Sequence, residues 1–350
     1  MQRQNRSEKK AKKSTPFVIK PDEVKVDRSN VLGRGGFGTV YRGRWGGHDV
    51  AVKLLDRGIS PEILRKEVDV WQSLRHPNIL EFYGYNSSDP LFLVSALKQG
   101  DAHAFLRSNP DASRPKLLYE TSLGLQHLHR HSIIHGDVKA LNILVDRRGT
   151  ACLSDFGLSR VRELSTGSSG SNNKGGPKGS FRWMAPECMV GTILGTPMSD
   201  IYSFGMTIYE IFTGHPPFPG LTDPVIYVEV AERKKRPNRP TDQEIESCGL
   251  DESTQLIWSI VSKCWRSCMQ SAKLFHWHNG THAHPGVPPH TPTPGMLLDR
   301  QVRVVPIGDH QSTPGEAPRN LLLGRLFVRT RTQVIQSSLY MLRKQIRSRP

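Results

Sequence analysis

The hydrophobic pattern of the chain changes from strand-like in its first part to helix-like in its second. Four short runs rich in β-branched and aromatic residues predict strands at 31–45, 48–56, 79–85 and 91–97. A helix separates the second run from the third, because apolar residues recur every three or four positions over 64–74, after a Ser-Pro start signal. The first part is therefore expected to form an antiparallel sheet with one helix.

The second part of the chain is expected to be mainly helical. The sequence Lys-Gln-Gly at 98–100 predicts a chain reversal that joins the two parts and offers backbone groups to a purine. Leucines lie on one face of a helix at 115–131, and the run 199–214 is apolar nearly all round, with Ser as N-cap and Gly at its end, as expected of a central buried helix. Further helices are expected at 224–232 and 253–265. Together these elements predict an α+β fold with two lobes.

Positive charge is concentrated at the two ends of the chain. The net charge is +16, of which residues 1–20 carry +6 and residues 321–350 carry +7, so the 300 residues between them carry only +3. This placement gives no reason to expect specific binding of nucleic acid by the core. The first residues predict a solvated basic arm, with nuclear import through KKAKK as the second interpretation.

Cysteine usage and hydropathy indicate an intracellular location. Five cysteines at scattered spacings do not suit a disulfide framework and fit a reducing compartment. The chain starts with charged residues where a signal peptide needs an apolar run, and no stretch approaches the ~20 apolar residues of a membrane span. We therefore expect a soluble protein of the cytoplasm or the nucleus.

Candidate chemistry is concentrated in the stretch 134–157, IHGDVKALNILVDRRGTACLSDFG, which holds Asp137, Lys139, Asn142 and Asp155. Phosphoryl transfer from a magnesium nucleotide needs one carboxylate to accept a proton from the attacking hydroxyl. It needs a second carboxylate and an amide oxygen to hold Mg²⁺ against the phosphates. Alone, this pattern is a moderate signal, because an Asp in a turn is more often a cap or turn former than a catalyst.

Two further features favour phosphate binding. Gly33, Gly35 and Gly38 form a G-x-G-x-x-G motif, whose glycines let a hairpin backbone approach phosphates. A dinucleotide-binding fingerprint would open a helix after the last glycine, whereas this chain continues as a strand. Lys53 in the next strand and Glu67 on the inward helix face are expected to pair, because an inward carboxylate is costly without a partner.

Seven segments in order resemble the motifs of a eukaryotic protein kinase over about residues 25–266: GRGGFGTV, VAVK, Glu67, HGDVKALN, DFG, APE and DIYSFG. The resemblance implies a bilobal protein kinase-like fold, with an antiparallel β N-lobe carrying one helix and a mainly helical C-lobe. Lys139 and Ser180 look like the serine/threonine type. RWMAPE together with HPNI resembles the tyrosine-kinase-like branch of serine/threonine kinases.

The resemblance implies catalytic and nucleotide-binding roles residue by residue. Asp137 would be the base, Lys139 would stabilise the γ-phosphate, and Lys53 with Glu67 would form the ion pair over the α- and β-phosphates. Ser95 would be a small gatekeeper in front of an accessible rear pocket. The whole ATP-binding set would be Leu32, Gly33, Gly35, Gly38, Val40, Ala51, Lys53, Ser95, Ala96, Leu97 and Leu144.

The same resemblance implies metal ligands and an aromatic spine. Asn142 and Asp155 would bind Mg²⁺, with Mn²⁺ as the other metal of choice. An apolar spine would tie the helix of the first lobe to the metal-binding loop by stacking Trp71, Phe82, His135 and Phe156, for which plain core packing is the competing interpretation. Asp200, at the start of the central helix, would be buried and should bond the backbone of the catalytic loop.

Three departures from the family pattern matter. Gly136 stands where an Arg usually grips a phosphorylated loop, so phosphorylation at Ser165, Thr166, Ser168 or Ser169 should control the enzyme weakly. After residue 267 the expected Pro-Arg loop and last helix are missing or altered, which removes the usual Arg partner of Glu187. The remaining chain combines His, Pro and Arg without sustained periodicity.

These observations give the expected domain boundaries. Residues 1–24 are a disordered basic arm, 25–268 a kinase domain with its N-lobe at 25–97 and C-lobe at 98–268, and 269–350 a non-globular tail. A zinc site of the form C-x3-C-x9-H-x3-H can be written with Cys264, Cys268, His278 and His282. A buried helix end explains the first cysteine better, because no strand pair precedes it.

Three functions compete. The first is transfer of the γ-phosphate of Mg-ATP to Ser or Thr hydroxyls of a protein substrate. The second is a pseudokinase scaffold, whose incomplete second lobe binds nucleotide without transfer. The third is an antibiotic-phosphotransferase type of small-molecule kinase, which shares the HGD pattern but has no place for the glycine-rich loop, APE or DIYSFG. The sequence does not indicate an oligomeric state.

Overall fold

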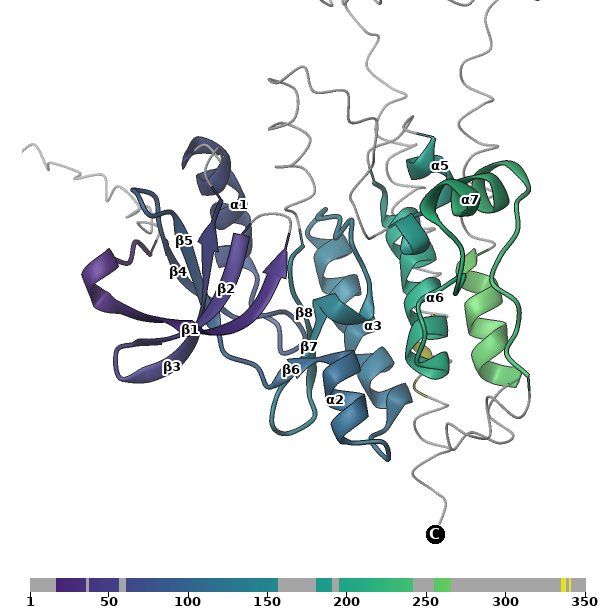
Figure 1. Ribbon diagram of the computed structural model, residues 1–350, viewed down its shortest axis with the longest axis horizontal. Coiled ribbons are helices and arrows are strands. Elements are labelled where there is room, and N and C mark those ends of the chain that lie inside the picture. Colours follow the sequence, from purple (N-terminus) through teal and green to yellow (C-terminus); the bar gives the residue numbers. More distant parts are fainter. Residues whose placement is uncertain are drawn as a thin grey trace, which may run out of the picture.

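The computed structural model describes residues 17–35, 38–56, 61–156, 181–190, 195–241, 255–265, 335–337 and 340. In Figure 1 the chain forms two lobes, a twisted sheet with one helix beside it and a larger assembly of helices. The two-lobed α+β fold expected from the sequence is confirmed.

The first lobe is built on a five-stranded antiparallel sheet in the order β1-β2-β3-β5-β4. Its strands are β1 (Val24–Gly35), β2 (Gly38–Trp45), β3 (His48–Leu55), β4 (Phe82–Asn86) and β5 (Phe92–Ala96). Gly46 and Gly47, with φ of 56° and 83°, make the tight turn between β2 and β3. The run 31–45 is therefore a hairpin of β1 and β2 that turns at the glycine motif.

Helix α1 (Pro61–Ser73) covers this sheet on one side (Figure 1). Its apolar stripe is buried as the spacing predicts, since Leu64 and Val68 pack with Tyr85 of β4 and Leu93 of β5. The helix begins at the proline of the Ser-Pro signal.

An additional strand-like segment precedes the sheet. Val18 forms a parallel bridge with Tyr85, the backbone N of Ile19 donates to Tyr85 O at 2.9 Å, and Tyr85 N donates to Phe17 O at 3.2 Å. Ile19 is fully buried, and a Cβ on Gly84 would lie 2.7 Å from its Cδ1. Residues 17–19 belong to the arm that the sequence analysis expects to be disordered, yet here they extend the edge of the sheet.

The second lobe contains a small antiparallel sheet, made of β6 (Gly100–Asp101), β7 (Ile143–Val145) and β8 (Ala151–Leu153). Its helical elements are α2 (Ala102–Ser108), α3 (Arg114–Arg130), the 3₁₀ turn η2 (Ala140–Asn142), the 3₁₀ turn η3 (Phe181–Trp183), α5 (Pro186–Met189), α6 (Pro197–Thr213), α7 (Asp223–Tyr227), the π turn η4 (Val228–Glu232) and a helix at 255–265. The helices expected at 115–131, 199–214, 224–232 and 253–265 are therefore confirmed, with small shifts of their ends.

Helix α6 is the centre of the second lobe (Figure 1). Every residue from Met198 to Phe212 is buried, as the apolar run predicts. The expected N-cap is corrected: Thr196, not Ser199, caps the helix, and Ser199 closes a reciprocal capping box at the third helical position. The helix at 255–265 packs closely against α6 at Gly205. A Cβ on Gly205 would lie 2.7 Å from the Cβ of Cys264.

Backbone hydrogen bonds join the lobes near the segment that follows α1. Leu80 N donates to Leu153 O at 2.9 Å, Leu153 N donates to Asn78 O at 3.0 Å, and the Asn78 side chain donates to Ala151 O at 2.8 Å. Strand β8 is therefore fixed to the first lobe. Among the described residues, no helix has both the length and the apolar character needed to cross a bilayer.

Candidate active site

The segment between α3 and β7 carries three of the predicted site residues and is held by its backbone. The buried Asp200 of α6 accepts from His135 N at 2.9 Å and from Gly136 N at 2.8 Å, and lies 2.8 Å from His129 Nε2. The expectation that Asp200 bonds this loop is confirmed. Gly136 has φ of 78°, a conformation that glycine adopts without strain.

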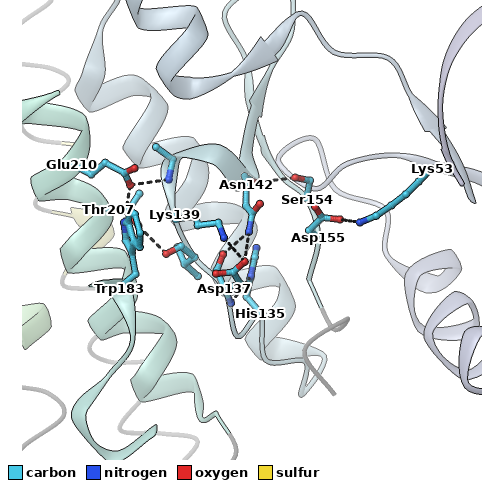
Figure 2. Close-up of polar contacts among 12 residues, drawn as sticks. Lys53, His135, Asp137, Lys139, Asn142, Ser154, Asp155, Trp183, Thr207 and Glu210 are labelled. Atoms are coloured by element: carbon cyan, nitrogen blue, oxygen red, sulfur yellow. Dashed lines mark hydrogen bonds and ion pairs between the residues drawn. The ribbon is translucent and has the colours of Figure 1, made fainter. Parts of the chain in front are cut away.

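Asp137, Lys139 and Asn142 form one linked cluster in this loop (Figure 2). Lys139 Nζ lies 2.7 Å from Asp137 Oδ2. Asn142 Nδ2 donates to Asp137 O at 2.7 Å and to Asp137 Oδ2 at 3.0 Å. Because both bonds use the amide nitrogen, the amide oxygen is the atom that Asn142 offers to a metal ion.

Lys53 and Asp155 meet across the two lobes. Lys53 projects from β3 and is 9% exposed, whereas Asp155 follows β8, and Lys53 Nζ lies 2.5 Å from Asp155 Oδ1. Asp155 has φ of 55°, a left-handed conformation that Asp tolerates better than most residues. The preceding Ser154 donates through both N and Oγ to Asn142 O, at 2.9 and 3.1 Å, which links this end of the site to the catalytic loop (Figure 2).

The four residues of the predicted aromatic spine contact one another in a continuous chain, through one tilted and two edge-to-face ring pairs. The ring centroids of Trp71 and Phe82 are 4.7 Å apart, those of Trp71 and Phe156 are 5.4 Å apart, and those of His135 and Phe156 are 6.3 Å apart. Complete burial lowers the pKa of His135, and its Nδ1 accepts from Asp137 N at 3.2 Å. This chain of ring contacts therefore joins α1 to both ends of the site.

Most of the predicted nucleotide-binding residues lie on β1, β2, β3 and β5 of the first lobe, whereas Leu97 follows β5 and Leu144 lies on β7 of the second sheet. Gly33 and Gly35 have open space where a Cβ would stand, while a Cβ on Gly38 would meet Leu54 O. Ala51 faces Ser95 in the β3–β5 register. Leu32 is 45% exposed, Ser95 is buried, and the remaining members are partly buried: Val40, Ala51, Ala96, Leu97 and Leu144.

Several predicted features lie outside the described residues. The backbone of Glu67 belongs to α1, but its side chain is not described, so its predicted pairing with Lys53 stays a prediction. The same holds for the segment 157–180, which includes Ser180 and the four expected phosphorylation sites, and for Cys268, His278 and His282 of the zinc pattern. Within the described ranges, no group of three or more His, Cys, Asp or Glu residues is placed to hold a metal ion.

Sequence reasoning missed a second anchor of the catalytic loop, Glu210. Its buried carboxylate accepts through Oε2 from Ala140 N at 2.9 Å and from Trp183 Nε1 at 2.8 Å (Figure 2). Its Oε1 lies 2.7 Å from His103 Nε2. The hydrogen bond between His103 and Glu210 raises the pKa of His103. The signal was present in the sequence, because a lone Glu inside an apolar helix must find donors.

Sequence reasoning also missed Arg182. Its guanidinium donates to Pro217 O at 3.0 Å, to Phe218 O at 2.5 Å and to Leu221 O at 2.5 Å. It thereby fixes the segment before α5 to the loop after α6. Glu187 of α5 has an interaction partner in the structure. The sequence predicts that its usual Arg partner is missing.

Comparison with known families agrees with this geometry. A family model described as protein tyrosine and serine/threonine kinase matches residues 26–272. The chain belongs to this kinase family. Kinases of this family use ATP with a divalent metal ion and act on protein substrates, so the linked acids, lysines and asparagine lie in a kinase fold.

Similar curated proteins are kinases named for serine/threonine or dual specificity. Dual specificity protein kinase shkA of Dictyostelium discoideum is 32% identical over 267 residues, covering 72% of this chain and 48% of that protein. Dual specificity protein kinase shkE of the same organism is 32% identical over 278 residues, covering 75% and 37%. A putative serine/threonine-protein kinase/receptor of Acanthamoeba polyphaga mimivirus is 32% identical over 259 residues, covering 70% and 15%. This chain matches less than half the length of each of these relatives.

Proposed function

We propose that this kinase is an active enzyme that transfers the γ-phosphoryl group of ATP to Ser or Thr hydroxyls of a protein. The observation that carries the proposal is the contact of Lys53 with Asp155 across the lobes, next to the linked cluster of Asp137, Lys139 and Asn142. Phosphoryl transfer requires mainly positioning and charge stabilisation, and this arrangement supplies both.

Asp137 is the catalytic base of this proposal. Its backbone is fixed by His135, and its carboxylate is oriented by Lys139 and Asn142, so it meets the substrate hydroxyl in one geometry. Lys139, 2.7 Å from that carboxylate, brings positive charge to the place where the transferred phosphoryl group passes.

Asn142 and Asp155 fit a divalent metal ion. An amide oxygen and a carboxylate are hard oxygen ligands of the kind that Mg²⁺ takes together with substrate phosphates. The side chain of Asp155 is 44% exposed, so a hydrated ion reaches it. Bound Mg²⁺ or Mn²⁺ would neutralise the phosphate charge, while Lys53 holds the α- and β-phosphates beneath the β1–β2 hairpin.

Serine/threonine specificity and membership of the tyrosine-kinase-like branch belong to the same proposal. Lys139, two residues after the base, supports a Ser/Thr acceptor, and the motif RWMAPE at 182–187 supports the branch. Several relatives carry dual-specificity names, so the test must distinguish transfer to Ser or Thr from transfer to Tyr.

We place the kinase domain at 25–268, with its N-lobe at 25–97 and its C-lobe at 98–268, and the enzyme in the cytoplasm or nucleus. The structure adds residues 17–19 to the sheet of the N-lobe. The family match over residues 26–272 is close to these bounds.

A nucleotide-binding pseudokinase is the second candidate, and one observation favours it. The Lys53–Asp155 ion pair occupies a carboxylate oxygen that the metal needs. In an active enzyme, this pair must exchange for contacts to phosphate and metal each time ATP binds. In a pseudokinase scaffold, the Lys53–Asp155 ion pair would remain when nucleotide binds.

The test is transfer of labelled phosphate from Mg-ATP to a generic basic protein, followed by identification of the labelled amino acid. The control is Asp137→Asn, which keeps the size of the side chain and removes the base. We expect label on Ser or Thr, and a loss of about 10²–10⁴-fold in the variant. Equal signals from both proteins, with thermal stabilisation by Mg-ATP in both, would establish the pseudokinase. Label on tyrosine would contradict the proposed specificity.

A further inference from the structure

A short helical segment near the end of the chain, described at residues 335–337 and 340, packs against α3. Ile335 is only 3% exposed and belongs to the large apolar cluster that also contains Leu118 and Leu125 of α3. Its neighbour Ser337 is exposed. The segment therefore has an inward and an outward side.

Polar contacts fix the segment in one register on α3. Gln336 Nε2 donates to Ser122 O at 3.0 Å, and Gln126 Nε2 donates to Gln336 Oε1 at 2.9 Å. The amide of Gln336 is thus used at both ends, once as donor and once as acceptor. Such a reciprocal pair is lost if the segment slides by one residue.

The contacts on α3 follow one face of that helix. The ring of Tyr340 lies 5.9 Å from that of Tyr119, and Gln336 contacts Ser122 and Gln126. Positions 119, 122 and 126 are spaced by three and four residues, which places them on one stripe of a helix. The segment therefore lies along α3 over two of its turns.

The expectation of a non-globular tail over 269–350, without sustained periodicity, is corrected here: residues 335–337 are helical and pack on the C-lobe, and the sequence around them has the pattern of an amphipathic helix. Apolar residues recur at Ile335, Leu339, Leu342 and Ile346, with spacings of four, three and four. No proline occurs between Pro318 and Pro350, although prolines are frequent before that point. This stretch is therefore compositionally distinct from the Pro- and His-rich sequence that precedes it.

Other side chains of α3 contact the β7–β8 hairpin, which carries the proposed metal ligands at its ends. Glu120 accepts from Ala151 N at 2.8 Å, and Lys116 Nζ donates to Gly149 O. Both contacts hold the β7–β8 hairpin, at whose ends Asn142 and Asp155 lie. A partner that fixes α3 therefore stabilises the support of the proposed metal ligands.

We infer that the segment described at residues 335–337 and 340 is an intramolecular docking element, which binds the face of α3 formed by Tyr119, Ser122 and Gln126 and completes the C-lobe. The occupant is this chain itself, because the buried Ile335 and the Gln336 pair join one chain to its own α3. The 69 residues between 265 and 335 are long enough for the segment to reach α3 of the same chain, since an extended chain spans ~3.3 Å per residue. The inference does not depend on phosphoryl transfer.

The experiment compares the full chain with Ile335→Asp and, as a matched control, Ser337→Asp. Both variants add the same charge to the same turn, but only the first puts it into the core. We expect Ile335→Asp to lower the melting temperature by about 5–10 °C and Ser337→Asp to leave it unchanged. Hydrogen exchange of the α3 amides at 119–126 should become faster in Ile335→Asp alone. Equal melting and equal exchange in all three proteins would overturn the inference.

A second arm covers the case in which Ile335→Asp does not fold. Single and paired Gln126→Ala and Gln336→Ala variants test the contact without adding charge, and non-additive melting shifts are expected because the two amides bond each other. Additive shifts would contradict the contact. Hydrogen exchange of the α3 amides is also measured over a tenfold range of protein concentration. Protection of α3 that rises with concentration, together with a dimer in sedimentation, would assign the face to a second copy and overturn the intramolecular assignment.

Discussion

At the residue scale, two buried carboxylates of α6 hold the catalytic loop by its backbone N–H groups. Asp200 accepts from His135 and Gly136 at the start of the loop, and Glu210 accepts from Ala140 further along. The loop is thus positioned by a helix that lies wholly in the core. Both carboxylates act through the backbone and are positioning residues.

Replacement of Glu210 by Ala tests this second anchor. The change leaves the Ala140 and Trp183 donors buried without their acceptor, so we expect a loss of about 3 kcal/mol in the free energy of unfolding. Urea unfolding measures it. Glu232→Ala removes the same charge from an exposed position and should leave the midpoint unchanged. A Glu210→Ala protein as stable as this control would show that the hydrogen bonds contribute little.

Three imidazoles in mutual contact predict acid sensitivity. The rings of His76 and His127 are 4.7 Å apart, and those of His127 and His131 are 4.4 Å apart. Burial, with His76, His131 and Arg130 nearby, lowers the pKa of His127 to about 4. The folded state therefore favours the neutral ring. This contribution to stability is complete above the ordinary pKa of 6.5 and falls as the pH drops toward 4.

Melting temperatures between pH 7 and pH 4 measure this effect. We expect His127→Phe to keep the ring contacts and to flatten the fall of the melting temperature with acid. His48→Phe removes a histidine from the surface and should leave the slope unchanged. An identical slope for the wild type and His127→Phe would contradict the assignment.

At the element scale, the strand-like segment 17–19 makes a specific prediction. Ile19 is fully buried and Val18 is 53% exposed, although they are neighbours. Ile19→Ala should therefore cost about 2–5 kcal/mol, while Val18→Ala should cost less than about 0.5 kcal/mol. Chemical unfolding of both variants measures the difference. Equal costs would mean that the segment does not pack against the sheet in solution.

Local patterns predicted most elements because each carries its own signal. The apolar stripe gave α1, the Gly-rich run gave the β1–β2 hairpin, and the uniformly apolar run gave the buried α6. The segment 17–19 escaped prediction because it is a short apolar triplet beside a basic arm, and its partner Tyr85 is distant in sequence. Only the small Gly84 opposite Ile19 hints at the pairing.

Local signals also explain which site residues were found. Asp137, Asn142 and Asp155 stand in a motif whose spacing matches their chemistry, and the structure places them in one linked group with Lys53. Glu210 has no such motif, and its donors come from three separate segments. A sequence shows that a buried carboxylate needs donors but not which donors the fold brings to it.

At the scale of the whole molecule, the two lobes hold β8 from both sides. The N-lobe side contributes Asn78 and Leu80 through backbone and side-chain hydrogen bonds, and the edge-to-face contact of Trp71 with Phe156 adds to it. The C-lobe contributes Glu120 of α3. Asp155 follows this strand directly, so its position relative to Lys53 reports the arrangement of the lobes.

The central claim is that Lys53 and Asp155, from different lobes, serve one metal-bound nucleotide. The most direct measurement is the rate of phosphoryl transfer from Mg-ATP to a basic protein by the wild type and by Asp155→Asn, with and without a chelator. The account predicts transfer by the wild type, a loss of at least about 100-fold in the variant, and no transfer with the chelator. Transfer by Asp155→Asn at the wild-type rate, or no transfer by the wild type in excess Mg²⁺, would contradict it.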